Sequence, residues 1–299
     1  MQNPWIRRAV YALGGLAAVV VAAVVAVYAV SAARLRHTFD APLVDVALGT
    51  DSATLARGQH LVRVVGKCAE CHGQDLGGAV FIPDGPARLI APNLTTAGVA
   101  GRYTTAEMAR AIRHGVRRDG TGLMIMPSAD FNVLSDADVG AIIAYIKSLP
   151  GVSRELPTTE LHFLGRALWT AGQLPLLDAA RIDHAKRQPA QVAMATGPEY
   201  GHYLADVGGC TGCHGPGLSG GKIPAVPPDW KPAANLTPTG IGAWSLDDFR
   251  RALRTGTRPD GTAIDTVMPW KASGQMTDDE IASVYAFLRT VPPKEFGNR

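Results

Sequence analysis

The longest apolar stretch of this chain lies close to its N-terminus. An uncharged run from Ala9 to Ala33, rich in alanine and valine, follows Arg7 and Arg8. It is longer than the roughly 20 residues that a helix needs to cross a bilayer. A cleaved signal peptide is the alternative, but the apolar part of such a peptide is only about 7–15 residues long. The pattern therefore predicts an uncleaved transmembrane anchor.

Beyond residue 50 the apolar positions predict short amphipathic helices. Ser52 is expected to cap a helix that runs towards Gly66. Thr104 or Thr105 is expected to cap a second helix, and Gly115 to end it. We find no pair of alternating segments that predicts a β-sheet. The fold class that follows is all-α.

Helix signals of the same kind return later in the chain. Ser135 precedes a stripe of apolar residues at helical spacing, and Pro150 closes that helix. Its counterpart opens at Thr277 with a capping-box sequence. Another helix is expected to start near Ser245 and to stop at Gly256. The predicted elements thus form two similar sets.

The residues themselves repeat as well. An offset of 142 positions aligns four segments with later copies: Cys68–Gly73 with Cys210–Gly215, Asn93–Thr95 with Asn235–Thr237, Met126–Pro127 with Met268–Pro269, and Leu149–Pro150 with Val291–Pro292. Internal repetition of this kind indicates two copies of one structural module. The predicted division is an anchor at 1–33, a linker at 34–50, a first module at 51–150, an interdomain linker at 151–195 and a second module at 196–299.

The interdomain linker has no counterpart elsewhere in the chain. Its apolar part, 161–177, is interrupted by Arg166, Gly172 and Pro175. It therefore predicts a packing or interfacial segment rather than a second membrane span.

Composition narrows the class of protein. Hydrophobic residues make up 46% of the chain, which argues against wholesale disorder. The formal net charge of +3, without a dense basic tract, gives no support for nucleic-acid binding. The four cysteines form two Cys-x-x-Cys pairs and none is left over. Such pairs occur in structural metal sites, redox disulfides and haem attachment sites.

A histidine follows each pair, at His72 and at His214. Zinc sites usually place their two pairs about 15–20 residues apart, far closer than Cys71 and Cys210. A thioredoxin-like motif needs a βαβ context, which is absent, and a disulfide does not need the histidine. Cys-x-x-Cys-His is the signature of c-type haem attachment, and residues i, i+3 and i+4 of a helical turn share one face.

The sequence therefore predicts two covalently bound haem c groups. Their attachment residues are Cys68 and Cys71 in the first module, and Cys210 and Cys213 in the second. The histidines are the predicted proximal iron ligands, and their other ring nitrogens should donate to a backbone carbonyl or a similar acceptor.

The sixth iron ligand is predicted to be a methionine sulfur. Met126 and Met268 occupy equivalent positions after their histidines, and a proline follows each. A methionine ligand favours ferrous iron and is common in electron carriers. Met124 is the alternative in the first module. Bis-histidine ligation by His60 and His202 is a weaker alternative, because both precede the cysteines on the proximal side.

Polar residues around the haems follow the same repeat. Arg113 and Arg254 occupy equivalent helix positions and could pair with haem propionates, because a guanidinium fork suits a carboxylate. A solvated helix face is the alternative. Asn93 and Asn235 are expected to shape the loop that lines the haem edge.

On these motifs the two modules resemble class I cytochrome c domains. The order of anchor and tandem modules resembles cytochrome subunits of membrane-bound alcohol and gluconate dehydrogenases, which usually carry three haems where this chain has two motifs. Dihaem subunits of cbb-type haem–copper oxidases are a second resemblance. The resemblance implies haem insertion outside a bacterial inner membrane. The N-terminus would then be cytoplasmic and both modules periplasmic.

We expect an electron-transfer protein, not an enzyme by itself, that works as a subunit of a respiratory or dehydrogenase complex. Its expected partners are other redox proteins: a dehydrogenase, a quinol-oxidising complex or a terminal oxidase. A dihaem peroxidase and a haem-based ligand sensor are rival hypotheses, and both would need an exchangeable iron position.

Overall fold

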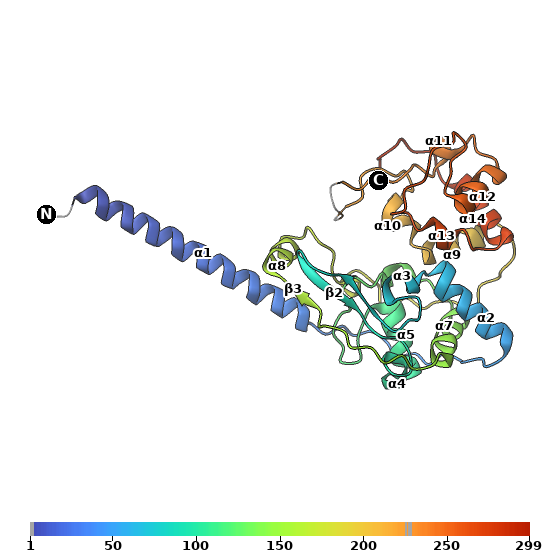
Figure 1. Ribbon diagram of the computed structural model, residues 1–299, viewed down its shortest axis with the longest axis horizontal. Coiled ribbons are helices and arrows are strands. Elements are labelled where there is room, and N and C mark those ends of the chain that lie inside the picture. The colour runs from blue at the N-terminus through green and yellow to red at the C-terminus, as the bar shows by residue number, and fades with distance from the viewer. Residues whose placement is uncertain (1–2, 225, 227–228) are drawn as a thin grey trace.

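The computed structural model describes residues 3–224, 226 and 229–299. Helix α1 (Pro4–Arg36) projects away from the rest of the molecule (Figure 1). Its most apolar window has a mean hydropathy of 2.5 and is 0% buried, and it is the one helix in the described part that is long and apolar enough to cross a membrane. The helix confirms the predicted apolar element.

The remaining helices form two similar sets. In the first module they are α2 (Ser52–His60), the π-helical turn η1 (Leu61–Val65), α3 (Cys68–His72), α4 (Val99–Arg102), α5 (Thr105–His114), α6 (Ser128–Phe131) and α7 (Asp136–Ser148). In the second they are α9 (Pro198–Val207), α10 (Cys210–His214), α11 (Pro238–Ile241), α12 (Leu246–Thr255), α13 (Trp270–Ser273) and α14 (Asp278–Thr290). The mostly helical class is confirmed.

Most predicted helix ends are correct. Thr104 caps α5 with a full capping box, and Gly115 ends the helix with φ +64°. Gly256 ends α12 in the same left-handed conformation, with φ +67°. The predicted cap of α2 is wrong by one residue. Asp51, not Ser52, is the N-cap, because its carboxylate accepts the Thr54 backbone N–H at 2.9 Å.

The first module also contains a small antiparallel sheet that we did not expect. Its strands are β1 (Ala79–Ile82), β2 (Ala87–Ala91) and β3 (Glu160–Leu161), in the order β1-β2-β3. These strands have two to five residues, too short for an alternating pattern to stand out. The third strand comes from the interdomain linker, so the pairing joins distant segments.

The interdomain linker packs onto the first module and onto α1. After β3 it forms helix α8 (Phe163–Thr170) and the 3₁₀ turn η2 (Asp178–Ala180). Helix α8 lies beside the C-terminal part of α1 (Figure 1). The Arg34 guanidinium donates to the carbonyl of Trp169 at 2.9 Å. The linker thus contacts both the first module and α1.

One apolar core runs through both modules. Helices α2 and α7 pack together in the first module, as α9 and α14 do in the second. The buried cluster includes Leu61 and Ile143 from one module and Leu204 and Ile281 from the other, each at 0% exposure. The two modules therefore share a hydrophobic core and are not separate domains joined only by a linker.

Candidate functional site

Both Cys-x-x-Cys-His motifs form one short helix with the same boundaries. A residue in the left-handed conformation precedes each helix: Lys67 before α3 and Gly209 before α10. Gly73 and Gly215 follow with φ +81°. On such a turn the cysteines and the histidine share one face. The local backbone thus presents three side chains to one ligand in each module.

The two histidines are oriented by the same hydrogen bond. His72 Nδ1 lies 2.8 Å from the Pro92 carbonyl oxygen, and His214 Nδ1 lies 2.7 Å from that of Ala234. A carbonyl only accepts, so Nδ1 carries the proton and Nε2 keeps its lone pair. This confirms the predicted carbonyl partner and leaves Nε2 available to an iron ion.

An asparagine holds the loop that carries each of these carbonyl groups. Asn93 Oδ1 accepts from the backbone N–H and the hydroxyl of Thr95, at 2.9 and 2.7 Å, while Nδ2 donates to Val152. Asn235 makes the equivalent bonds to Thr237 and to Lys294. The expectation that these asparagines shape the loop is confirmed.

The structure separates the two candidate methionines of the first module. Met126 packs against the shared core that also contacts Cys68, and Met268 packs against that same core. Met124 contacts a different cluster around β2 and α8 and forms a β-bridge with Leu177. This arrangement favours Met126 over Met124 as the sulfur ligand.

Burial favours neutral side chains at both motifs. Desolvation raises the pKa of the Cys68 thiol to about 12 and raises that of Cys210 as well. Burial also lowers the pKa of His72, against the opposing effect of its bond to Pro92. A zinc site would need thiolates, which this burial disfavours. Within the described ranges, no cluster of three or more His, Cys, Asp or Glu side chains could hold a metal ion.

The two arginines expected to pair with haem propionates bond instead to carbonyl and carboxylate oxygens of the protein. Arg113 is buried, donates to the Leu134 carbonyl at 2.6 and 3.0 Å, and pairs with Asp136 at 2.7 Å. Arg254 donates to the Gly274 carbonyl and pairs with Asp278 at 2.9 Å. Each arginine thus joins two helices of its module. These contacts do not support the predicted propionate pairing, nor a freely solvated face for Arg113.

The remaining repeated histidines are also engaged elsewhere. His60 Nε2 lies 2.7 Å from Oε2 of Glu280 in the other module. His202 stacks on Phe287 with ring centroids 4.5 Å apart and lies 3.4 Å from Asp206. These contacts disfavour bis-histidine ligation.

A lysine beside the first motif joins the two modules. The half-buried Lys67 ammonium donates to the carbonyl oxygens of Val65, at 3.0 Å, and of Gly208, at 2.9 Å. Gly208 lies just before the second motif, so this contact places the two attachment helices near each other. Sequence reasoning missed Lys67, because a lone lysine carries no signal of burial.

Arg57 connects the modules through a second contact. Its guanidinium makes two 2.9 Å bonds to Asp138 and lies 3.4 Å from Glu280. Tyr203 from the second module donates to Asp138 at 2.6 Å. Asp138 and Glu280 are related by the repeat offset of 142, a signal that could have identified this pair from the sequence.

Duplicate Cys-x-x-Cys-His turns and oriented imidazoles together define a c-type haem protein. The residues present therefore fit covalent haem: the cysteines as attachment points and the histidines as axial ligands.

The chain belongs to the cytochrome c family. The family model for cytochrome c matches residues 55–150 and 199–292. The two matched stretches lie within the two modules.

Several curated proteins are similar to this chain. The cytochrome c subunit of a quinone alcohol dehydrogenase from Gluconacetobacter polyoxogenes is 29% identical, over 87% of this chain and 62% of its own length. The cytochrome subunit of fructose dehydrogenase from Gluconobacter japonicus is 30% identical, over 81% of this chain and 53% of its own. The gluconate 2-dehydrogenase cytochrome c subunit from Pantoea cypripedii is 28% identical, over 82% of this chain and 61% of its own length. The chain thus spans less than two thirds of the length of these relatives.

Proposed function

We propose that this chain is a membrane-tethered cytochrome c that carries two covalent haems and transfers electrons between redox proteins. One observation carries the proposal: the attachment turn and its imidazole–carbonyl bond occur twice with the same geometry, at His72 and His214. A bound haem supplies a reversible one-electron change at its iron.

The roles of the side chains follow from their positions. Cys68 and Cys71, and likewise Cys210 and Cys213, are the proposed thioether attachment points. His72 and His214 are the proposed proximal ligands, and their carbonyl acceptors prevent the rings from turning. Met126 and Met268 are the proposed sulfur ligands, and both pack against the shared core. A sulfur ligand leaves no open position for substrate, which favours electron transfer over peroxidase or ligand-sensing chemistry.

Helix α1 is the proposed tether. Its side chains are exposed along the apolar window, as a lipid-facing helix requires. We place the helix once across a bacterial inner membrane, with the N-terminus cytoplasmic and residues 51–150 and 196–299 forming two periplasmic haem domains. Tethering raises the effective concentration of the haem domains near membrane partners.

The relatives suggest which partners these are. Two of them are named as subunits of alcohol and fructose dehydrogenases, and a shorter match is a cbb3-type oxidase subunit from Azorhizobium caulinodans. We propose that this chain likewise accepts electrons from a dehydrogenase or a quinol-oxidising complex, or delivers them to a terminal oxidase.

The haem content provides the test. Intact-mass spectrometry of the mature protein should show the mass of the polypeptide plus two haems. Cys71→Ser and Cys213→Ser should each disturb attachment at one site and leave the other intact, so each variant is the control for the other. A mature protein without added porphyrin mass would contradict the proposal. So would a high-spin haem that reacts with peroxide in the wild-type protein.

A further inference from the structure

Helix α8 presents apolar side chains beside the membrane helix. Phe163 and Leu164 are 45% and 55% exposed. The opposite face of the helix is covered, because Trp169 is buried and a methyl group on Gly165 would overlap the Pro86 carbonyl oxygen. The exposed pair is thus held in place by a packed helix.

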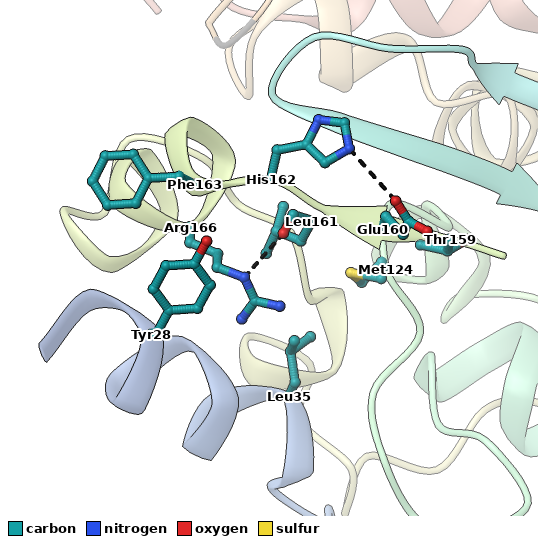
Figure 2. A pocket seen from close by; sticks show the side chains of 9 residues that line it. All are labelled: Tyr28, Leu35, Met124, Thr159, Glu160, Leu161, His162, Phe163 and Arg166. Atoms are coloured by element: carbon teal, nitrogen blue, oxygen red, sulfur yellow. Dashed lines mark hydrogen bonds and ion pairs between the residues drawn. The ribbon is translucent and has the colours of Figure 1, made fainter. Parts of the chain in front are cut away.

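Several contacts fix α8 against the C-terminal part of α1. The rings of Tyr28 and Phe163 stack with centroids 6.2 Å apart. The Arg166 guanidinium donates to the Ser31 hydroxyl at 2.8 Å and lies 5.1 Å from the centre of the Tyr28 ring. Figure 2 shows Tyr28 of α1 facing Phe163 and Arg166 of α8. Helix α8 cannot move away from α1 without breaking them.

These contacts set the level of α8 relative to the membrane. The apolar run from Ala9 to Ala33 is about 37 Å long at about 1.5 Å per residue, somewhat more than the roughly 30 Å hydrocarbon core. Its last residues therefore lie at the boundary between acyl chains and headgroups. Because Tyr28 and Ser31 lie in this part of the run, Phe163 and Leu164 lie at that boundary too.

The charges at this level fit a lipid surface. Arg34 and Arg36 form the basic end of α1, and Arg166 of α8 donates to Ser31, one turn before Arg34. Basic side chains next to exposed apolar ones are typical of helices that lie in the interface and bury their apolar face by about 5–10 Å. A hollow of about 440 Å³ between α1, α8 and β3, lined by Leu35 and Met124 among others, opens at the same place (Figure 2).

From this geometry we infer that α8 is a second membrane contact, which inserts Phe163 and Leu164 among the lipids where α1 leaves the bilayer. The inference rests on the proposed tether. The contact fixes the tilt of the first module on the membrane. Its occupant is the lipid bilayer, because the exposed pair continues the lipid-facing surface of α1.

Site-directed spin labelling of the full-length holoprotein tests this. The native cysteines are consumed by haem attachment, so Leu164→Cys introduces the free thiol that takes the nitroxide label. The protein is reconstituted into vesicles of phosphatidylglycerol and phosphatidylethanolamine, and collisions with oxygen and with a water-soluble nickel complex are measured. Val19→Cys, 66% exposed inside the span, is the lipid control, and Met194→Cys, 64% exposed, is the aqueous control.

The label at residue 164 should show an oxygen-to-nickel collision ratio several-fold above that at residue 194. A ratio equal to that at residue 194, with a lipid-like label at residue 19, would overturn the α8 contact while the tether stands. Water-like labels at both 19 and 164 would overturn the tether itself. A label at 164 shielded from both reagents would show that protein covers α8, either a second copy or a partner, and would also overturn the inference.

Discussion

Each proposed proximal histidine is oriented by a loop that an asparagine side chain holds in place. The Asn93 side chain holds the loop whose Pro92 carbonyl accepts the His72 proton, and Asn235 does the same for His214. The hydrogen bond fixes the tautomer and the orientation of the imidazole, with Nε2 as the nitrogen that would bind iron. The asparagines are thus part of the site through the backbone.

The methionines give a prediction that separates ligand from packing residue. Met126→Ala and Met268→Ala should each keep both haems attached but lower the potential of one site, because the sulfur ligand favours ferrous iron. Each should also open that site to carbon monoxide. Redox titration of the purified variants measures the change. Met124→Ala is the matched control, since Met124 packs in the other cluster, and an altered potential in that variant would contradict the assignment of Met126.

Asp130 gives a prediction about pH. Burial raises the pKa of its carboxyl to about 6, and the neighbouring Asp178 adds to this effect. The folded protein therefore binds the proton more tightly than the unfolded chain, so the free energy of unfolding falls as pH rises from about 4 to about 6. Asp130→Asn should be more stable than wild type at pH 7, by at most about 3 kcal/mol, and equal to it below pH 4.

Thermal or denaturant unfolding across this pH range measures the effect. Asp84→Asn is the control, because the Asp84 side chain is 87% exposed and its replacement should leave the profile unchanged. A stability difference for Asp130→Asn that is the same at pH 4 and pH 7 would contradict the explanation.

At the scale of elements, the modules are built around one close helix crossing each. A methyl group on Gly58 of α2 would overlap the Ala141 carbonyl oxygen of α7, and one on Gly201 of α9 would overlap the Ser283 carbonyl oxygen of α14. Ala141 and Ser283 are related by the repeat offset of 142. Both crossings therefore depend on a glycine that lets two backbones approach.

Gly201→Ala should consequently destabilise the second module. Overpacking of a tight contact costs about 1–3 kcal/mol, occasionally more, and here the obstacle is backbone that cannot rotate away. Chemical denaturation followed by circular dichroism measures the change. Gly14→Ala is the control, because Gly14 lies in helix α1 outside both modules and a methyl group there meets nothing within 4 Å. Equal stability of the two variants would show that the crossing relaxes without cost.

At the scale of the whole molecule, buried charges hold the two modules together. Arg57 contacts both Asp138 of its own module and Glu280 of the other, and Lys67 donates to Gly208 across the same boundary. The Lys67 contact lies directly before both attachment turns. The relative placement of the two Cys-x-x-Cys-His turns thus depends on side chains between the modules rather than on the interdomain linker alone.

The Arg57→Met variant should therefore have a lower free energy of unfolding than the wild-type protein. Removing one partner of a buried ion pair costs about 3–5 kcal/mol, because the carboxylates of Asp138 and Glu280 lose their counter-charge. Adding Glu280→Gln should recover part of that loss. Denaturant titration of the single and double variants provides the measurement. Arg251→Met, which removes a surface ion pair with Asp248, is the control. Its free energy of unfolding should fall by less than about 1 kcal/mol. Similar losses of stability in Arg57→Met and Arg251→Met would refute a special role for Arg57.

The sequence by itself determined the long apolar N-terminal helix, the repeated modules, the Cys-x-x-Cys-His motifs and most helix ends. These features depend on the spacing of neighbouring residues, on capping residues such as Thr104, and on repetition at a fixed offset. All three can be recognised in the sequence without knowledge of tertiary contacts. The sequence also identified the histidines and the pair of equivalent methionines, because both copies carry them at the same positions.

Only the tertiary structure decided contacts between segments far apart in the chain. It separated Met126 from Met124, assigned Arg113 to Leu134 and Asp136, and brought Lys67 into contact with Gly208. It also paired β3 with β2 and placed α8 beside α1. The physical reason is the same in each case: burial and hydrogen-bond partners depend on which surfaces meet, and a side chain carries no local signal of a neighbour contributed by a distant segment.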